Sequence, residues 1–225
     1  MAKNKILNRA LTSVLGIFIV LLIITFSIGL PIYVRPFYYM QINLWDIPEE
    51  TGHSVSEIKE AYNEMMNFLV LPNREFGTGV FKYSETGKSH FVDCKKLFNL
   101  NITVFVISLT AVVTLYVLHK KKIFNLCRPF GKHLLFTCGV STLSFFGLLG
   151  IICVINFDFA FTVFHLLLFP NNEDWLFDPY LDEIILALPE QFFMSCGILI
   201  ASSIILICTF LMIYGLKKRP KNEVS

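Results

Sequence analysis

The chain has 225 residues, 55% of them hydrophobic, and a mean hydropathy of +0.63. This much apolar surface excludes an ordinary soluble domain. The net charge of +2 hides a strong segregation of basic from acidic segments, which indicates membrane topology and excludes a nucleic-acid footprint.

Four apolar stretches are long enough to cross a bilayer, at about residues 11–30, 102–118, 134–155 and 192–216. About 20 helical residues span a hydrocarbon core of about 30 Å. Backbone in lipid must also satisfy its own hydrogen bonds. We therefore predict an all-α membrane protein with four transmembrane helices. The first stretch lacks a small-x-small cleavage site, so we expect it to remain as an anchor.

Basic residues are concentrated in the N-terminal tail, between the second and third spans, and in the C-terminal tail. They are Lys3, Lys5, Arg9, Lys120, Lys121, Lys122, Arg128, Lys132, Lys217, Lys218, Arg219 and Lys221. The positive-inside rule places these segments and both termini in the cytoplasm. Residues 31–101 and 156–191 are then extracytoplasmic.

The first extracytoplasmic segment, residues 31–101, is long enough for a subdomain that caps the bundle. Residues 37–45 alternate enough to be extended. A capping-box pattern at Ser54 then opens an amphipathic helix of about 16 residues, which ends before Pro72. Glycines and aromatic residues in 75–88 suggest a small β-hairpin. We expect the following residues to form the outer end of the second transmembrane helix.

The second extracytoplasmic segment, residues 156–191, has no Lys or Arg. Its acids are Asp158, Glu173, Asp174, Asp178, Asp182, Glu183 and Glu190. Residues 157–169 are rich in phenylalanine, and we expect a helix that dips into the outer leaflet or packs across the bundle. Asp178 before Pro179 resembles an N-cap, which predicts a short amphipathic helix to about Ala187. Glu190 is expected in the first turn of the fourth span.

The cysteines and histidines show no metal-site spacing. Four cysteines lie in the spans and Cys127 is cytoplasmic, so Cys94 has no external partner for a disulfide. No HxH or HExxH pattern is present, and we expect neither metal nor cofactor. His90 and His165 stand out because both are expected at the outer mouth of the bundle with acids nearby. Two unrelated interfacial histidines are the alternative.

Other candidate residues also have two interpretations. The acidic segment is either a solvated surface or an attractor for a protonated amine. Arg35 either pairs with a lipid phosphate or extends its guanidinium to the headgroups. The cluster from Trp175 to Pro179 is more typical of packing than of a cofactor-binding motif.

Two sequence motifs resemble the bacterial lipoprotein intramolecular transacylases, the Lit family. They are FHLLLFPNNEDWLFDPYLDEIILALPEQFF and, before the second span, SHFVDCKKLF. The plan of four spans with a large first external segment is also similar. Phe91 and Cys94 depart from the family pattern, which has Met and Val at these positions. Pro170 and Asn171 replace a more open Gly-Asp turn.

The resemblance implies an enzyme of the bacterial cytoplasmic membrane that acts on diacylated lipoproteins. It would move the sn-2 acyl chain of the diacylglyceryl-cysteine to the α-amine of that cysteine, giving a lyso-form lipoprotein. It would work as a monomer among membrane phospholipids, without a cofactor. The family's two functional histidines correspond to His90 and His165.

The roles of the surrounding residues follow as expectations. One imidazole would act as base and the other as acid, in an order that the sequence does not assign. Asp93 would orient His90. The other substrate-binding or orienting candidates are Arg35, Trp175, Asp178 and Glu190. The alternatives are a non-catalytic tetraspan scaffold or adhesion protein, and a lipid ester hydrolase in which water replaces the amine.

Overall fold

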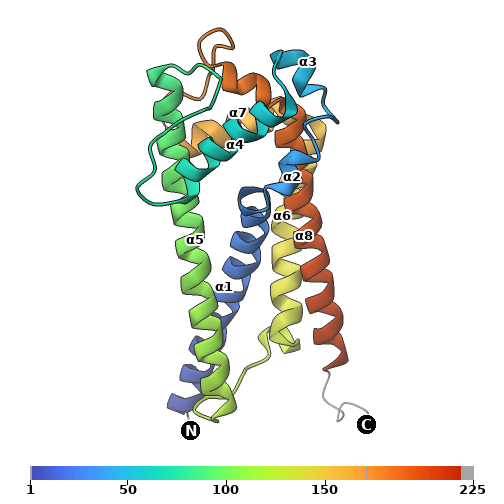
Figure 1. The fold of residues 1–225 in the computed structure, drawn as a ribbon. Coiled ribbons are helices and arrows are strands. Elements are labelled where there is room, and N and C mark those ends of the chain that lie inside the picture. Colours follow the sequence, from blue (N-terminus) through green and yellow to red (C-terminus); the bar gives the residue numbers. More distant parts are fainter. Residues whose placement is uncertain (1, 171, 219–225) are drawn as a thin grey trace. The chain divides into compact units, whose positions relative to one another are not determined.

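The computed structural model describes residues 2–170 and 172–218, whose fold is shown in Figure 1. Every regular element in these residues is helical. Four features of the sequence lie outside the described part of the chain: Asn171, Arg219, Lys221 and the side chain of Lys3.

Four long helices form most of the chain, drawn as the long blue, green, yellow and red ribbons of Figure 1. They are α1 (Ala2–Tyr33), α5 (Glu85–Lys120), α6 (Leu134–Ile155) and α8 (Glu190–Lys217). Each is long and apolar enough to cross a membrane. The predicted all-α membrane protein with four transmembrane helices is therefore confirmed.

The chain forms two compact units, and each long helix contributes to both. The first unit comprises Met1–Ile28, Ile102–Ile151 and Ile200–Ser225, and includes the short 3₁₀ helix η1 (Pro129–Gly131). Its helices pack closely where small residues meet. A Cβ atom on Gly139 of α6 would lie 2.9 Å from the carbonyl oxygen of Cys208 on α8. Such contacts are typical of membrane helices, because small residues let two backbones approach.

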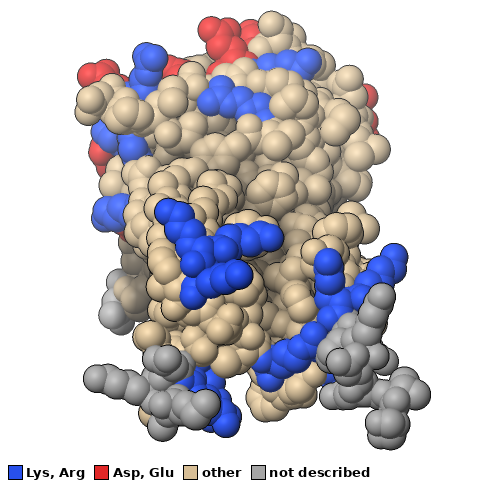
Figure 2. All heavy atoms as spheres, turned by 90° about the horizontal axis from the view of Figure 1, so that it is seen from below, with Lys and Arg blue, Asp and Glu red and all other residues tan. Residues whose placement is uncertain are grey.

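Three basic segments meet at one end of this first unit. The amide of Asn125 donates to the side chain of Asn8 at 3.1 Å, which joins the segment after α5 to α1. The guanidinium of Arg128 donates to the carbonyl of Lys218 at 3.0 Å, at the end of α8. Figure 2, which views the molecule from this end, shows Lys and Arg side chains gathered here. The described residues of the unit include no Asp or Glu to neutralise them.

The second unit comprises Gly29–Asn101 and Ile152–Leu199. Besides the ends of the long helices it holds α2 (Pro36–Tyr39), α3 (Ile47–Thr51), α4 (Val55–Val70), α7 (Phe157–Leu168) and the 3₁₀ helix η2 (Glu183–Ala187). Its core is built around Tyr38 and Tyr62, whose rings stack at 3.8 Å. The Tyr38 hydroxyl donates to the carbonyl of Ala187 at 2.8 Å. The buried ring therefore keeps a partner for its polar end.

α4 is the amphipathic helix that the sequence predicts. Its capping box is present: the Ser54 hydroxyl accepts from the amide of Glu57, and the Glu57 carboxylate accepts from the amide of Ser54 at 2.8 Å. The buried side of the helix is formed by Ile58, Ala61, Tyr62, Met65, Met66, Phe68 and Leu69. A capping pattern followed by apolar residues at helical spacing was therefore sufficient to locate this element.

The prediction of a β-hairpin in residues 75–88 is wrong. Backbone amides that a hairpin would use in its ladder donate instead to carboxylates from other elements. The amide of Gly79 donates to Glu64 at 2.6 Å, and that of Lys82 donates to Glu183 at 3.0 Å. The segment is therefore an irregular strap, held by acids that are distant in sequence.

Two further local predictions are wrong. Residues 37–45 are not extended, because Pro36 opens the helical turn of α2 and turns follow it. Asp178 does not cap an α-helix. Its carboxylate accepts from the amide of Tyr180 at 2.9 Å in a local turn, and only the short η2 follows.

Candidate active site

Two histidine side chains from different helices meet in the second unit. His90 lies on α5 and His165 on α7, and their ring centroids are 5.8 Å apart with an interplanar angle of 35°. They are 6% and 7% exposed, respectively. The structure therefore brings together the two imidazoles that the sequence singled out, and it removes both from bulk solvent.

The hydrogen bond of His165 fixes the position of its proton. The Nδ1 atom lies 2.8 Å from the carbonyl oxygen of Phe161, one turn earlier on α7. A carbonyl oxygen can only accept, so Nδ1 carries the hydrogen atom. The neutral ring then has a free lone pair on Nε2. This is the form that a general base requires.

Aromatic rings enclose the His165 imidazole. Trp175 stacks on it at 4.7 Å between centroids with an angle of 26°, and Phe161 lies at 4.2 Å. Burial lowers the pKa of His165, because the charged form loses its hydration, while the hydrogen bond to Phe161 acts in the opposite direction with smaller effect. The ring is therefore held neutral below the pH at which a free histidine would become protonated.

His90 has a different set of partners. Its Nε2 atom lies 3.3 Å from the sulfur of Cys94, one turn later on α5. Its Nδ1 atom is buried and has no hydrogen-bond partner among the described residues. The rings of Phe169 and Phe177 lie 4.8 and 5.4 Å from it. A buried polar atom without a partner is uncommon, and this nitrogen is therefore open to a ligand.

Asp93 links α5, which carries His90, to the loop after α7. One oxygen of its carboxylate accepts from Lys96 at 2.7 Å, and the other accepts from the side-chain amide of Asn172 at 3.1 Å. The carbonyl of Asn172 accepts from the indole of Trp175 at 3.1 Å, and this indole stacks on His165. Among the described residues no hydrogen bond joins Asp93 to His90. Its contacts therefore support the other ring.

A buried acid holds the start of α5, one turn and a half before His90. The carboxylate of Asp182 is 3% exposed and accepts from the amide of Ser84 at 2.7 Å and from its hydroxyl at 2.9 Å. An anion is favourable here because the first amides of a helix carry partial positive charge. A Cβ atom on Gly87 would collide with this carboxylate and crowd Phe177. The absence of a side chain at Gly87 therefore allows α5 to begin against Asp182.

Within the described part of the chain, the remaining predicted residues make no hydrogen bond or ion pair with the histidine pair. The guanidinium of Arg35 donates to Asn63 at 2.8 Å and to Asn67 at 2.7 Å, both on α4. Asp178 is engaged in its local turn. Glu190 is exposed at the first position of α8.

Several residues of the site were not singled out from the sequence. Cys94 is one helical turn after His90, and this spacing alone would have placed it beside the ring. Asn172 and Asp182 had no such signal, since their partners Asp93 and Ser84 are distant along the chain.

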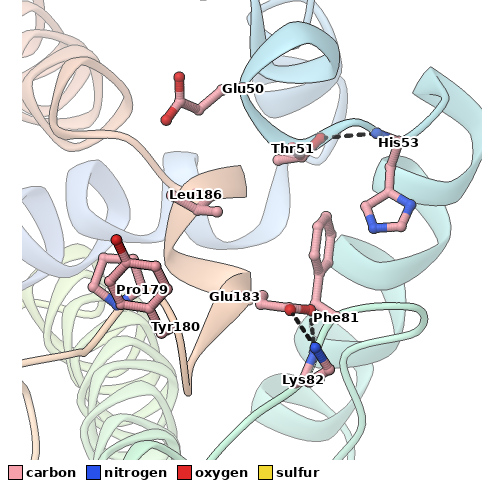
Figure 3. A pocket seen from close by; sticks show the side chains of 9 residues that line it. All are labelled: Glu50, Thr51, His53, Phe81, Lys82, Pro179, Tyr180, Glu183 and Leu186. Carbon is pink, nitrogen blue, oxygen red and sulfur yellow. Dashed lines mark hydrogen bonds and ion pairs between the residues drawn. The ribbon is translucent and has the colours of Figure 1, made fainter.

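A separate cavity of about 620 Å³ lies in the same unit (Figure 3) and contains neither histidine of the pair. It is lined by Glu50, Thr51, His53, Phe81, Lys82, Pro179, Tyr180, Glu183 and Leu186. The Lys82 ammonium contacts Glu183 at 2.8 Å. The hydrogen bonds that the Glu183 carboxylate accepts from the side chain and the amide of Lys82 hold its pKa below its usual range. The Lys82–Glu183 ion pair has a structural explanation, because it holds the irregular strap that precedes α5.

Fold and site together define a polytopic membrane protein with a shielded histidine pair suited to proton transfer. The family model described as "Lipoprotein intramolecular transacylase Lit" matches residues 13–193. The chain belongs to this family of acyltransferases. Comparison with curated protein sequences gave no significant match.

Solved structures agree with the family assignment. The chain is similar to the membrane integral lipoprotein intramolecular transacylase Lit from Bacillus cereus, solved in meso. The two are 29% identical, with a TM-score of 0.83, over 94% of this chain and 97% of the other. Structures of that protein with one histidine changed to arginine or to alanine match at 28% identity and a TM-score of 0.77. They cover 94% of this chain and 93% and 94% of theirs.

Proposed function

We propose that the chain transfers the sn-2 acyl group of a diacylglyceryl-cysteine lipoprotein to the α-amine of the same cysteine, with His165 as the general base. The observation that carries the base assignment is the bond from Nδ1 of His165 to Phe161, which leaves Nε2 able to accept a proton. His90, 5.8 Å away between centroids, is the proton donor to the ester oxygens.

The reaction balances within one substrate molecule. The amine nitrogen attacks the ester carbonyl, a carbon–nitrogen bond forms, and the bond to the glycerol oxygen breaks. The amine loses one proton to His165, the departing oxygen gains one from His90, and transfer of a proton from His165 to His90 restores both neutral rings. An α-amine has a pKa of about 7.7–8.0, so a substantial fraction is neutral near pH 7. Holding amine and ester together contributes up to roughly 7–11 kcal/mol, and acid–base help about 10²–10⁴-fold.

The aromatic walls support transfer to an amine over transfer to water. Phe161, Phe169, Phe177 and Trp175 surround the two imidazoles and offer apolar surface for an acyl chain. Excluding water protects the ester from hydrolysis.

We also infer roles for the outlying candidates and a membrane orientation. Asp178 and Glu190 attract the substrate ammonium, and Arg35 supports the site through α4, close to membrane phospholipid. The basic end of the first unit faces the cytoplasm, so that both termini are cytoplasmic and the histidines are extracytoplasmic. The enzyme acts as a monomer in the bacterial cell membrane.

The test is expression in a host that lacks its own N-acylating enzyme, followed by mass spectrometry of the lipoprotein N-terminal peptide. We expect an acyl group on nitrogen and a free hydroxyl on the glyceryl group. His90→Ala and His165→Ala should lose transfer by at least about 10²-fold, whereas His53→Ala, a change outside the pair, should retain it.

Two outcomes would contradict the proposal. A product that has lost the acyl group but keeps a free amine would identify a hydrolase. Near-normal transfer by either variant of the histidine pair, at equal membrane abundance, would show that these rings do not carry the chemistry.

A further inference from the structure

Cys94 gives His90 a hydrogen-bonding partner one helical turn later on α5. Its sulfur is 3.3 Å from Nε2 of His90 on the same helix. The opposite ring nitrogen, Nδ1, is buried and has no partner among the described residues. The two nitrogens of His90 therefore differ: one is engaged by a thiol, and the other is open to a ligand.

The direction of the thiol contact follows from the strengths of the two groups. A neutral thiol is a weak donor and a weaker acceptor, whereas the lone pair of an imidazole nitrogen is a good acceptor. The more favourable arrangement has the S–H group of Cys94 donating to Nε2. The hydrogen atom of the neutral His90 ring then resides on Nδ1, since a neutral imidazole carries one.

We propose that Cys94 is a positioning residue that holds His90 in its Nδ1-protonated form, so that His90 donates to the substrate while His165 accepts. This inference rests on the proposed function and deepens it, because it gives the two rings opposite roles. His165 carries its hydrogen on the nitrogen bonded to Phe161 and presents a lone pair. His90 presents an N–H group.

The unpaired Nδ1–H group has an energetic consequence. A buried donor without an acceptor has lost its hydrogen bond to water and is destabilising. An ester oxygen placed there would remove this cost, and the interaction strengthens as negative charge develops on that oxygen. A neutral imidazole is known to act as such an electrophile in other enzymes.

Charged and titratable groups around His90 are compatible with this arrangement. The groups that interact electrostatically with His90 are His165 on α7, Asp93 on the same helix as His90, and Asp174 in the loop after α7. Asp93 is already bonded to Lys96 and Asn172. Among the described residues, Cys94 therefore makes the one hydrogen bond to the His90 ring.

The first test reads the tautomer directly and needs no turnover. Nitrogen NMR of histidine-labelled protein, with His90 assigned by comparison with His90→Gln, should show the hydrogen on Nδ1. In Cys94→Ala the Nε2-protonated form should appear, while Cys94→Ser should retain the wild-type form because its hydroxyl donates. An Nε2-protonated His90 in the wild type, or an unchanged tautomer in Cys94→Ala, would overturn the proposal.

The second test is kinetic. Cys94 acts only through His90, so loss of the thiol should lower the rate without abolishing it. We expect kcat of Cys94→Ala to fall about 3- to 10-fold with KM unchanged, and Cys94→Ser to recover most of it. Cys153→Ala, on an exposed cysteine of α6, is the control. A serine variant as slow as the alanine variant would show that the thiol only fills space, whether or not the pair catalyses transfer.

Discussion

The carboxylate of Asp93 accepts a hydrogen bond from the side chain of Asn172 at 3.1 Å. This bond ties the helix that carries His90 to the loop whose tryptophan stacks on His165. The distance between the two imidazole rings therefore depends on Asp93, which makes no hydrogen bond to either ring among the described residues. A displacement of about 1 Å is enough to slow a reaction about 10²-fold.

The link should be visible in a double-mutant cycle. We expect Asp93→Ala and Asn172→Ala each to lower kcat between about tenfold and 10²-fold, because either change releases Trp175 from its support. The double variant should be no slower than the slower single variant, since both remove the same interaction. Lys96→Ala is the control: it removes an ion pair whose lysine side chain is 72% exposed, and such pairs contribute little. Additive losses would contradict the link.

The pH dependence of transfer should report the shielding of His165. The rate requires a neutral amine and a neutral base, so both groups contribute to its fall as the pH decreases. The amine titrates at about 7.7–8.0, and a free histidine at about 6.5. Because burial lowers the pKa of His165, the wild-type plot of log rate against pH should keep a slope of one below pH 6.5.

Removal of the stacked indole should change that slope. In Trp175→Ala water reaches the ring and the pKa of His165 returns toward its ordinary value. The slope below pH 6.5 should then approach two. Identical profiles for the two proteins, measured with one lipopeptide substrate, would show that His165 is not the titrating base.

Gly87→Ala should destabilise the protein even though alanine normally favours helices. The new methyl group would meet the Asp182 carboxylate and Phe177, so the start of α5 must shift. We expect a loss of about 1–3 kcal/mol in the free energy of unfolding, measured by thermal unfolding in detergent. Gly147→Ala on α6 is the matched control, because nothing lies within 4 Å of its Cβ position. Equal unfolding temperatures for the two variants would contradict the close contact.

Arg35→Lys should lower Tm, whereas its effect on kcat should be small. The guanidinium binds Asn63 and Asn67 at once, and a lysine ammonium lacks this planar fork. Each kcal/mol lost corresponds to about 2–4 °C in Tm for a chain of this size. Arg74→Lys, on an exposed arginine, should change neither quantity. A large loss of rate at unchanged Tm would instead indicate direct contact between Arg35 and the substrate.

Hydropathy and helical spacing were sufficient for the larger features of the fold. The four long helices follow from apolar length, and α4 follows from the capping box at Ser54 and its apolar stripe. The strap at 75–88 was mispredicted because its amides bind Glu64 and Glu183, which are remote in sequence. Local sequence patterns cannot reveal how these backbone amides are hydrogen-bonded, because their acceptors are brought close only by the tertiary structure.

The candidate site was predictable in its titratable groups and unpredictable in their arrangement. His90 and His165 were identified from their motifs, and the fold places them together. Asp93 was expected to orient His90, whereas its hydrogen bonds lead to Lys96 and Asn172. That difference arises because Asn172 comes from a loop whose position depends on the packing of α7, which the sequence pattern does not specify.

The stack of Trp175 on His165 also supplies an optical reporter. The chain contains only two tryptophans, and the other, Trp45, is partly exposed on a different segment. A Trp45→Phe background would leave one indole, 4.7 Å from the imidazole. Its fluorescence would then follow protonation of the ring and arrival of an acyl chain in real time, without any attached dye.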